Sequence, residues 1–88
     1  MADKEHKIGI NIGELIYDTN DLGLAAFLQV MGIELKVMTK VNKKTLFSFK
    51  DKPERKDYVN DYFTGRARVA PLAFKNAMKN LKSYTFNK

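Results

Sequence analysis

The side chains of this sequence best suited to chemistry are its lysines and arginines, and the chemistry they suit is the binding of phosphate. Three lysines near the C-terminus recur at i, i+4 and i+7 with amide and hydroxyl neighbours, in the set Lys75, Asn76, Lys79, Asn80, Lys82 and Ser83. Such a row suits contacts to phosphate and hydrogen bonds to sugars or base edges. Arg66 and Arg68 are expected on a short extended linker between two helices, where they are well placed for bidentate phosphate contacts. With four lysines around a predicted hairpin, the sequence predicts a nucleic-acid-binding surface of Lys36, Lys40, Lys43, Lys44, Arg66, Arg68, Lys75, Lys79 and Lys82.

The distribution of charge supports this prediction. The net charge is +6, yet residues 1–34 hold two lysines against six carboxylates, whereas residues 35–88 hold fourteen lysines and arginines against four. Clustered cations attract polyanions at long range. We therefore expect a nucleic-acid partner, DNA rather than RNA, or else an acidic protein surface. Two plainer readings remain open: lysines keep a small domain soluble, and Arg66 and Arg68 could pair with Asp57 and Asp61.

Residues for catalysis are scarce. The chain has no cysteine, and its one histidine, His6, lies near the N-terminus. Nucleophilic schemes that use Cys/His or Ser/His/Asp therefore lack a base. Gly9 and Gly13 match no phosphate-binding loop pattern. The sequence predicts a non-enzymatic protein without a cofactor.

A metal site is a weaker alternative. Asp57 and Asp61 stand at i, i+4 with Glu54 a turn earlier, and such carboxylates can hold Mg²⁺. Arg55 and Lys56 lie between them, which is typical of a solvated helix face. We expect no metal here.

Length and composition define the setting. Eighty-eight residues allow one domain. We expect a flexible N-terminal tail over residues 1–7 and a single domain over residues 8–88. A domain of this size without cysteines favours a reducing cytoplasm, that of a bacterial host if the protein is phage-encoded. The N-terminus reads as neither a signal peptide nor a membrane span.

The first third of the chain predicts a strand and a helix. Isoleucines alternate with polar residues and glycine over residues 8–12, and residues 15–17 are a second strand candidate, so one edge strand is expected within residues 8–17. A helix follows, with Thr19 or Asn20 as its N-cap and Asp21 near its positive end. It should run to about Met31, with Gly32 left-handed.

That helix is apolar on nearly every side, because Gln29 is the only polar residue inside it. Such a helix must be covered all round. Either part of Leu22–Met31 faces a second copy in a homodimer, or the helix is wedged between a sheet and other helices.

A β-hairpin and two helices complete the pattern. The hairpin strands should point Ile33, Leu35, Val37, Phe47 and Phe49 inward, with Asn42 at positive φ in the turn. The second helix is announced by a capping Asp51, Pro53 and Glu54, and it ends at about Thr64 before Gly65. Its buried stripe is predicted as Tyr58, Val59, Tyr62 and Phe63. The last helix opens at Pro71 and should bury Phe74, Ala77, Met78 and Leu81.

These elements define a small α+β domain of the order β-α-β-β-α-α, with an antiparallel hairpin packed against helices. The aromatic residues fall mostly at core spacing, so no row of exposed rings for stacking bases is expected.

Four segments carry a resemblance to a known family: the helix ending in glycine over Asp21–Gly32, the strand Phe47–Phe49, the segment Asp57–Gly65, and the ending from Pro71 to Lys82. In these the chain resembles a family of small uncharacterised proteins from phages and mobile elements, a domain of unknown function. The likeness covers about residues 17–86. It implies a phage or prophage accessory protein and assigns no functional residues. A nucleic-acid-binding accessory protein is thus our first hypothesis, and a protein-interaction module, such as an inhibitor of a host protein, is the second.

Overall fold

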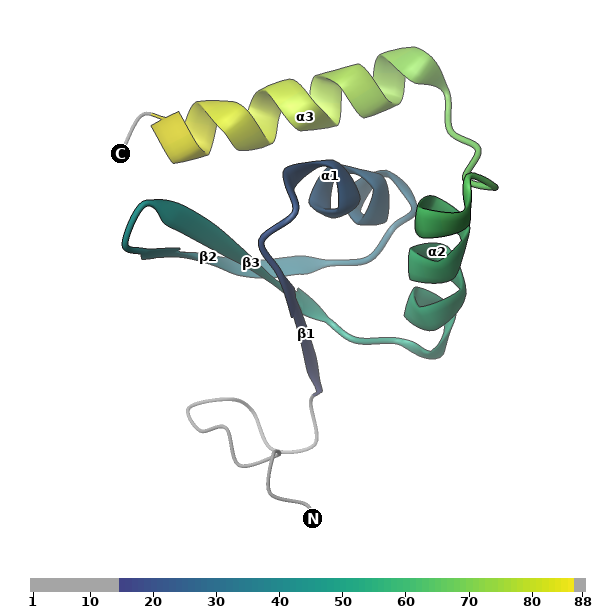
Figure 1. Ribbon diagram of the computed structural model, residues 1–88, viewed down its shortest axis with the longest axis horizontal. Helices are drawn as coiled ribbons and strands as arrows, with labels where there is room; N and C mark the ends of the chain where they lie inside the picture. The colour runs from purple at the N-terminus through teal and green to yellow at the C-terminus, as the bar shows by residue number, and fades with distance from the viewer. Residues whose placement is uncertain (1–14, 87–88) are drawn as a thin grey trace.

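The computed structural model describes residues 15–86, and Figure 1 shows how they are arranged. These residues form β1 (Ile16–Thr19), α1 (Leu22–Val30), β2 (Leu35–Val41), β3 (Lys44–Lys50), α2 (Pro53–Thr64) and α3 (Pro71–Phe86). The predicted α+β fold and the predicted order are confirmed. The predicted tail over residues 1–7 and the alternating segment 8–12 lie outside the described residues.

The three strands form one antiparallel sheet in the order β1-β3-β2. The central strand is β3. An edge strand, β1, overlaps the predicted range of residues 8–17 at Ile16 and Tyr17 and continues to Thr19. Phe47 and Phe49 of β3 are 2% and 0% exposed, as expected for inward-facing residues. Asn42 has φ 58° in the turn, as predicted. Short polar side chains tolerate this left-handed conformation, so Asn42 allows the tight reversal between β2 and β3.

Strand β2 departs from the predicted alternation. Leu35 pairs with Phe49 and Val37 pairs with Ser48, so two residues of β2 advance while β3 moves by one. This bulge turns Val37 to the opposite face of the sheet, where it is 52% exposed. Met38, opposite Phe47, takes the inward position instead. The prediction that Val37 points inward was wrong because a strict period of two does not anticipate a bulge.

Helix α1 begins one or two residues later than predicted. Its N-cap is Asp21, whose Oδ1 accepts the Leu24 N–H at 3.0 Å. The Thr19 hydroxyl accepts the Asp21 N–H at 3.1 Å. The predicted N-cap, Thr19 or Asn20, was therefore wrong, and Thr19 supports the capping residue instead. The helix ends as predicted, since Gly32 has φ 95°.

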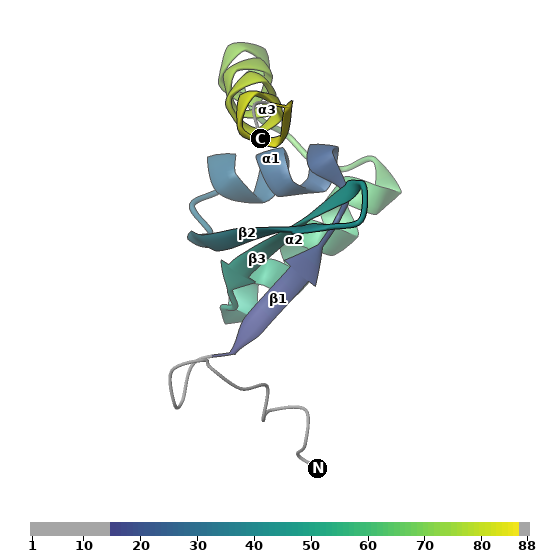
Figure 2. The ribbon, with the colours of Figure 1, turned by 90° about the vertical axis from the view of Figure 1, so that its left-hand side faces the viewer.

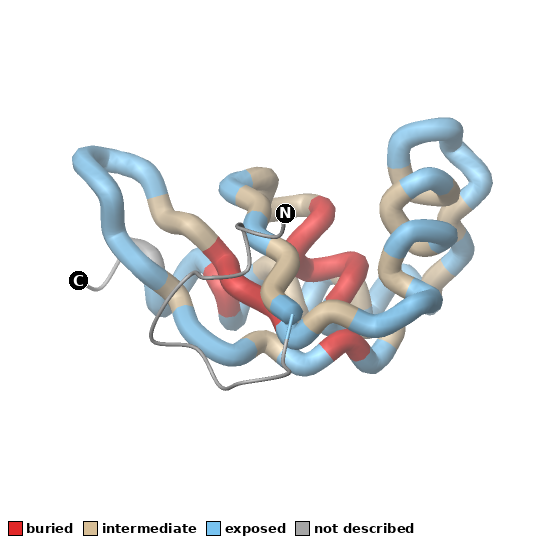
Figure 3. Tube along the Cα trace, turned by 90° about the horizontal axis from the view of Figure 1, so that it is seen from below, coloured by how far each residue is buried: buried red, intermediate tan, exposed pale blue. Residues whose placement is uncertain are grey.

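Helix α1 lies in the middle of the molecule. The sheet lies on one side of it, α3 lies across the other, and α2 closes one end (Figures 1 and 2). Residues Leu24 to Leu28 are at most 2% exposed. The wedged arrangement therefore accounts for the all-apolar pattern, and those five residues have almost no surface left to contact a second copy. With Ile33, Phe47, Phe49 and Leu81 they form the core, seen as the red segments of Figure 3.

Helices α2 and α3 follow the predicted bounds. Pro53 stands in the first turn of α2, and Gly65 ends that helix at φ 81°. The N-cap is Lys52 and not the predicted Asp51. Along α3, Leu81 is buried, and Phe74, Ala77 and Met78 are partly buried against the core. That stripe is the predicted one.

Only one face of the sheet is covered by a helix of the described part of the chain (Figures 1 and 2). Pairing places Val37, Val41 and Leu46 on the other face. Val37 and Val41 are 52% and 50% exposed there. The sheet thus presents an apolar strip on the side away from α1.

Candidate functional site

The β2–β3 hairpin displays lysines at its tip. Lys43 lies in the turn, and Lys40 and Lys44 lie on the flanking strands. All three are exposed. Residues 35–50 contain five lysines and no carboxylate, so the whole hairpin is positively charged.

Helix α3 displays a second set of lysines. Lys75, Lys79 and Lys82 are exposed, whereas the side of α3 that packs on α1 is apolar. The helix contains no aspartate or glutamate. A helix of this length is about 24 Å long, which matches about seven base steps of B-form DNA.

Helix α3 and the hairpin extend toward the same end of the molecule. The C-terminal end of α3 and the β2–β3 turn lie on the left of Figure 1 and toward the viewer in Figure 2. Lys82, late in α3, is therefore on the same side as the hairpin tip, and Lys79 and Lys75 follow along the helix. We call Lys40, Lys43, Lys44, Lys75, Lys79 and Lys82 the lysine surface. Its members do not all face one way, because the register places Lys40 on the face of the sheet toward α1 and Lys44 on the opposite face.

Among the described residues, no ion pair involves Lys43, Lys44, Lys75 or Lys79. The carboxylates lie elsewhere: on β1, before and after α1, and in residues 51–61. The basic excess therefore belongs to the hairpin, the linker and α3, while residues 51–65 carry charges of both signs.

Three of the nine predicted cations lie apart from the lysine surface. Lys36 is at the far end of β2 from the hairpin turn, and its Nζ is 3.7 Å from a carboxylate oxygen of Glu34. Arg66 and Arg68 are on the linker between α2 and α3, at the opposite end of α3 from Lys82 (Figure 1). The predicted cations thus do not form one cluster: Arg66 and Arg68 lie at one end of α3, the lysine surface begins at the other end, and Lys36 lies apart from both.

The linker arginines Arg66 and Arg68 are held differently. The Arg66 Nε lies 3.7 Å from Asp61 Oδ1, which agrees with the alternative of an ion pair, but its side chain remains 65% exposed. Such an exposed pair contributes little to stability. The exposed Arg68 donates from Nη1 to the Ala67 carbonyl oxygen at 3.1 Å. Both guanidinium groups remain accessible to an anion.

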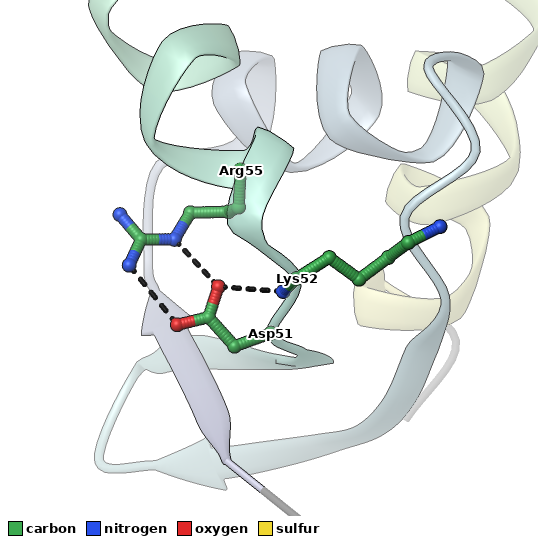
Figure 4. Close-up of polar contacts among 3 residues, drawn as sticks. All are labelled: Asp51, Lys52 and Arg55. Carbon is green, nitrogen blue, oxygen red and sulfur yellow. Dashed lines mark hydrogen bonds and ion pairs between the residues drawn. The ribbon is translucent and has the colours of Figure 1, made fainter.

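The sequence interpretation missed Arg55, which it assigned to a solvated face. Its side chain is 18% exposed, and its Nε and Nη2 donate to the two Asp51 carboxylate oxygens at 2.9 and 3.0 Å (Figure 4). Asp51 Oδ1 also accepts the Lys52 N–H at 2.9 Å. The guanidinium lies 4.1 Å from the centre of the Tyr17 ring on β1. Arg55 therefore fastens the start of α2 to the edge of the sheet.

This bidentate contact shifts the pKa of both partners. The hydrogen bond from Arg55 lowers the pKa of Asp51, and partial burial opposes that shift. The same bond raises the pKa of Arg55. The i, i+4 spacing of Asp51 and Arg55 was the available signal, but the contact to Tyr17 was not visible along the chain.

The sequence interpretation also misplaced Phe63. It was predicted in the buried stripe of α2, yet it is 62% exposed. Tyr58, Val59 and Tyr62 do pack against the core. The four positions span an arc of about 140° around the helix, and Phe63 lies at the edge of that arc, farthest from Tyr58.

Tyr62 connects this exposed ring to the core. Its ring lies 5.6 Å from that of buried Phe27 at 30°, and 5.2 Å from that of Phe63 at 82°. Burial raises the pKa of the Tyr62 hydroxyl, and the Asp21 carboxylate adds to the effect. Tyr62 also fills the space beside Gly23 of α1, where a Cβ atom would collide with the tyrosine hydroxyl.

Two negative findings concern residues 15–86. No group of three or more His, Asp or Glu side chains is arranged there to hold a metal ion. Nor does that part of the chain contain a helix with the length and apolarity needed to cross a membrane.

Comparison with known families gives one match. The family described as a domain of unknown function (DUF5659) matches residues 14–87, and the chain belongs to this family. The match covers all six elements of the fold. Searches among curated proteins and among solved structures gave no match.

Proposed function

We propose that this protein is a small non-enzymatic accessory protein that binds nucleic acid through the lysine surface. The observation that carries the proposal is the segregation of charge: the hairpin and α3 display lysines without a single carboxylate. Lysine is a compact, strongly hydrated point charge and a common partner of phosphate.

The expected affinity follows from counterion release. If all six lysines of the surface contact duplex phosphates, the logarithm of the binding constant falls with the logarithm of salt concentration at a slope of about −5. Affinity for DNA would then drop roughly 10³-fold between 50 and 200 mM salt. Binding of this kind selects polyanions and not a sequence.

The test is a salt series with random duplex and single-stranded oligonucleotides. Lys75→Glu/Lys79→Glu should reduce the steepness of the salt dependence for duplex DNA by about two, since each lost phosphate contact removes about 0.9. The matched control is Lys52→Glu/Lys56→Glu, which makes the same charge change at exposed positions beside the carboxylates of α2. Equal effects of the two pairs, or no binding of either nucleic acid at 50 mM salt, would overturn the proposal.

A second candidate function is that of a protein-interaction module, for example an inhibitor that binds an acidic patch on a host protein. The apolar strip on the uncovered sheet face favours it, because exposed apolar surface next to charge is typical of protein interfaces. Val37→Ser/Val41→Ser, which removes apolar surface without changing charge, would abolish partner binding under this hypothesis and leave nucleic-acid binding intact.

The setting belongs to the proposal as well. We infer action in the cytoplasm, since the chain contains no cysteine for disulfides. A phage or mobile-element origin is inferred from the resemblance noted above, in which case the cytoplasm is that of the bacterial host.

A further inference from the structure

Strand β2 is an edge of the sheet that the rest of residues 15–86 leaves uncovered. The order β1-β3-β2 places it at one side of the sheet, and β3 is the one element of the described chain with which it makes extensive contact. The opposite edge differs, because β1 has four residues against the seven of β2, and Arg55 of α2 lies over its Tyr17 ring. An edge strand offers the backbone groups on its outer side to one more strand.

Alternate side chains of β2 form an apolar row. The register with β3 places Val37, Thr39 and Val41 on the face of the sheet away from α1, beside Leu46 of β3. In a sheet, the side chains of an added strand stand next to those of its neighbour on the same face at every second position. The row therefore fits a partner segment whose apolar side chains alternate in the same way. The bulge at the start of β2 limits this regular pairing to the stretch from Val37 to the turn.

The charge of the hairpin selects the occupant of this edge. Residues 35–50 contain five lysines and no carboxylate. Lys43 and Lys44, at the turn, are exposed and form no ion pair with any described residue. A second copy of β2 would bring the same positive charges together, and like charges on neighbouring strands destabilise their pairing. A strand that carries carboxylates is attracted instead.

We propose that β2 is a docking site for an extended acidic segment of a partner protein, which adds to the three-stranded sheet as a fourth strand. Its alternate apolar side chains would cover Val37, Thr39 and Val41, and its carboxylates would lie near the lysines of the hairpin turn. In this mode of recognition the backbone hydrogen bonds supply affinity and the side-chain pattern supplies selectivity. The proposal rests on the second candidate function, that of a protein-interaction module, and deepens it by stating the conformation and charge of the partner.

The experiment uses labelled peptides as long as β2 in an anisotropy assay. The first alternates valine with glutamate, and the second has the same composition with the valines and glutamates in separate blocks. The alternating peptide is expected to bind more tightly, although the two carry equal charge. A third peptide, with lysine in place of glutamate, should not bind.

Two methylated peptides test whether the contact is a strand pairing. Both have the alternating sequence, one with N-methyl groups on its glutamates and the other with N-methyl groups on its valines. Successive N–H groups of a strand point to opposite sides, so only one of the two sets can face β2. One methylated peptide should therefore lose binding, and the other should keep it.

On the protein, Val37→Ser/Val41→Ser should weaken binding of the alternating peptide by about 10- to 100-fold, because two half-exposed valines no longer gain apolar contact. Leu72→Ser is the matched control, since Leu72 is an apolar residue of α3 that is 66% exposed, and it should bind the peptide like wild type. The variants should keep the melting temperature of the wild type to within a few degrees, which excludes misfolding as the cause of a loss.

The docking site is overturned if the alternating and block peptides bind equally, or if the two methylated peptides behave alike. It is also overturned if no peptide binds while oligonucleotides bind in the salt series described above, a result that leaves the nucleic-acid function standing. Binding of the alternating peptide without binding of any oligonucleotide supports the docking site and overturns the nucleic-acid function alone.

Discussion

Helices α2 and α3 make opposite use of their polar sides. Both start at a proline, and both pack apolar residues against the core. Both also carry cations at spacings typical of an exposed helix face. In α2, Arg55 is paired with the Asp51 carboxylate and lies over the Tyr17 ring, so its charge attaches the helix to β1. Helix α3 contains no carboxylate, and its lysines Lys75, Lys79 and Lys82 lie on its exposed side.

The spacing of cations along a helix therefore does not reveal their role. The role of a cation depends on which partners lie within its reach. For Arg55 these partners are Asp51, which precedes α2, and the Tyr17 ring on β1. Substitutions near α2 should therefore change stability, and substitutions on the polar side of α3 should change binding alone.

The largest expected effect concerns the packing of α2 on α1. Gly23→Ala places a Cβ against the Tyr62 hydroxyl and should destabilise the protein by about 1–3 kcal/mol, as overpacking does. In a Tyr62→Phe background the obstructing oxygen is gone, and the same change should be neutral or stabilising by up to about 1 kcal/mol, since alanine favours helix more than glycine. Urea unfolding of the four proteins in this cycle gives the coupling energy. Additive effects would show that Tyr62 does not limit position 23.

The next effect concerns the attachment of α2 to β1. Asp51→Asn removes the charge from the bidentate contact with Arg55 and should cost about 1–2 kcal/mol at pH 7, because hydrogen bonds to charged groups are the stronger ones. The pKa of Asp51 is lower in the folded protein than its ordinary value of 3.8, so its stabilisation is complete above that value and is lost as pH falls through the folded pKa.

The difference in unfolding free energy between wild type and Asp51→Asn should accordingly shrink as pH is lowered below about 4. Asp57→Asn, at an exposed carboxylate of the same helix, is the control for the loss of one negative charge. A gap between wild type and Asp51→Asn that stays constant from pH 7 to pH 3 would contradict the assigned role of the ion pair.

The smallest effect is expected on α3. Lys75→Gln/Lys79→Gln should change the unfolding free energy by less than about 0.5 kcal/mol, as surface substitutions without partners do. The same protein should bind nucleic acid with a shallower salt dependence than wild type. A loss of stability comparable to that of Asp51→Asn would show that these lysines, like Arg55, are part of the fold.

Much of the architecture was predictable because its signals are local. Asn42, Gly32 and Gly65 adopt the left-handed conformations that their residue types favour, and they end the elements where expected. Val37 and Phe63 were mispredicted because facing depends on register and helical phase, which a bulge or one extra residue changes. Of the nine cations predicted to bind nucleic acid, Lys36, Arg66 and Arg68 lie apart from the hairpin tip and from the C-terminal end of α3.

The sequence by itself determined the element order, the positions of the turns and the accumulation of positive charge after residue 34, since each depends on residue type and short-range spacing. Only the tertiary structure decided which side chains are covered: α1 inside its own protomer, Arg55 on Tyr17, and Phe63 left open. Burial and pairing depend on residues distant along the chain, and the packing of the sheet and helices brings those residues together.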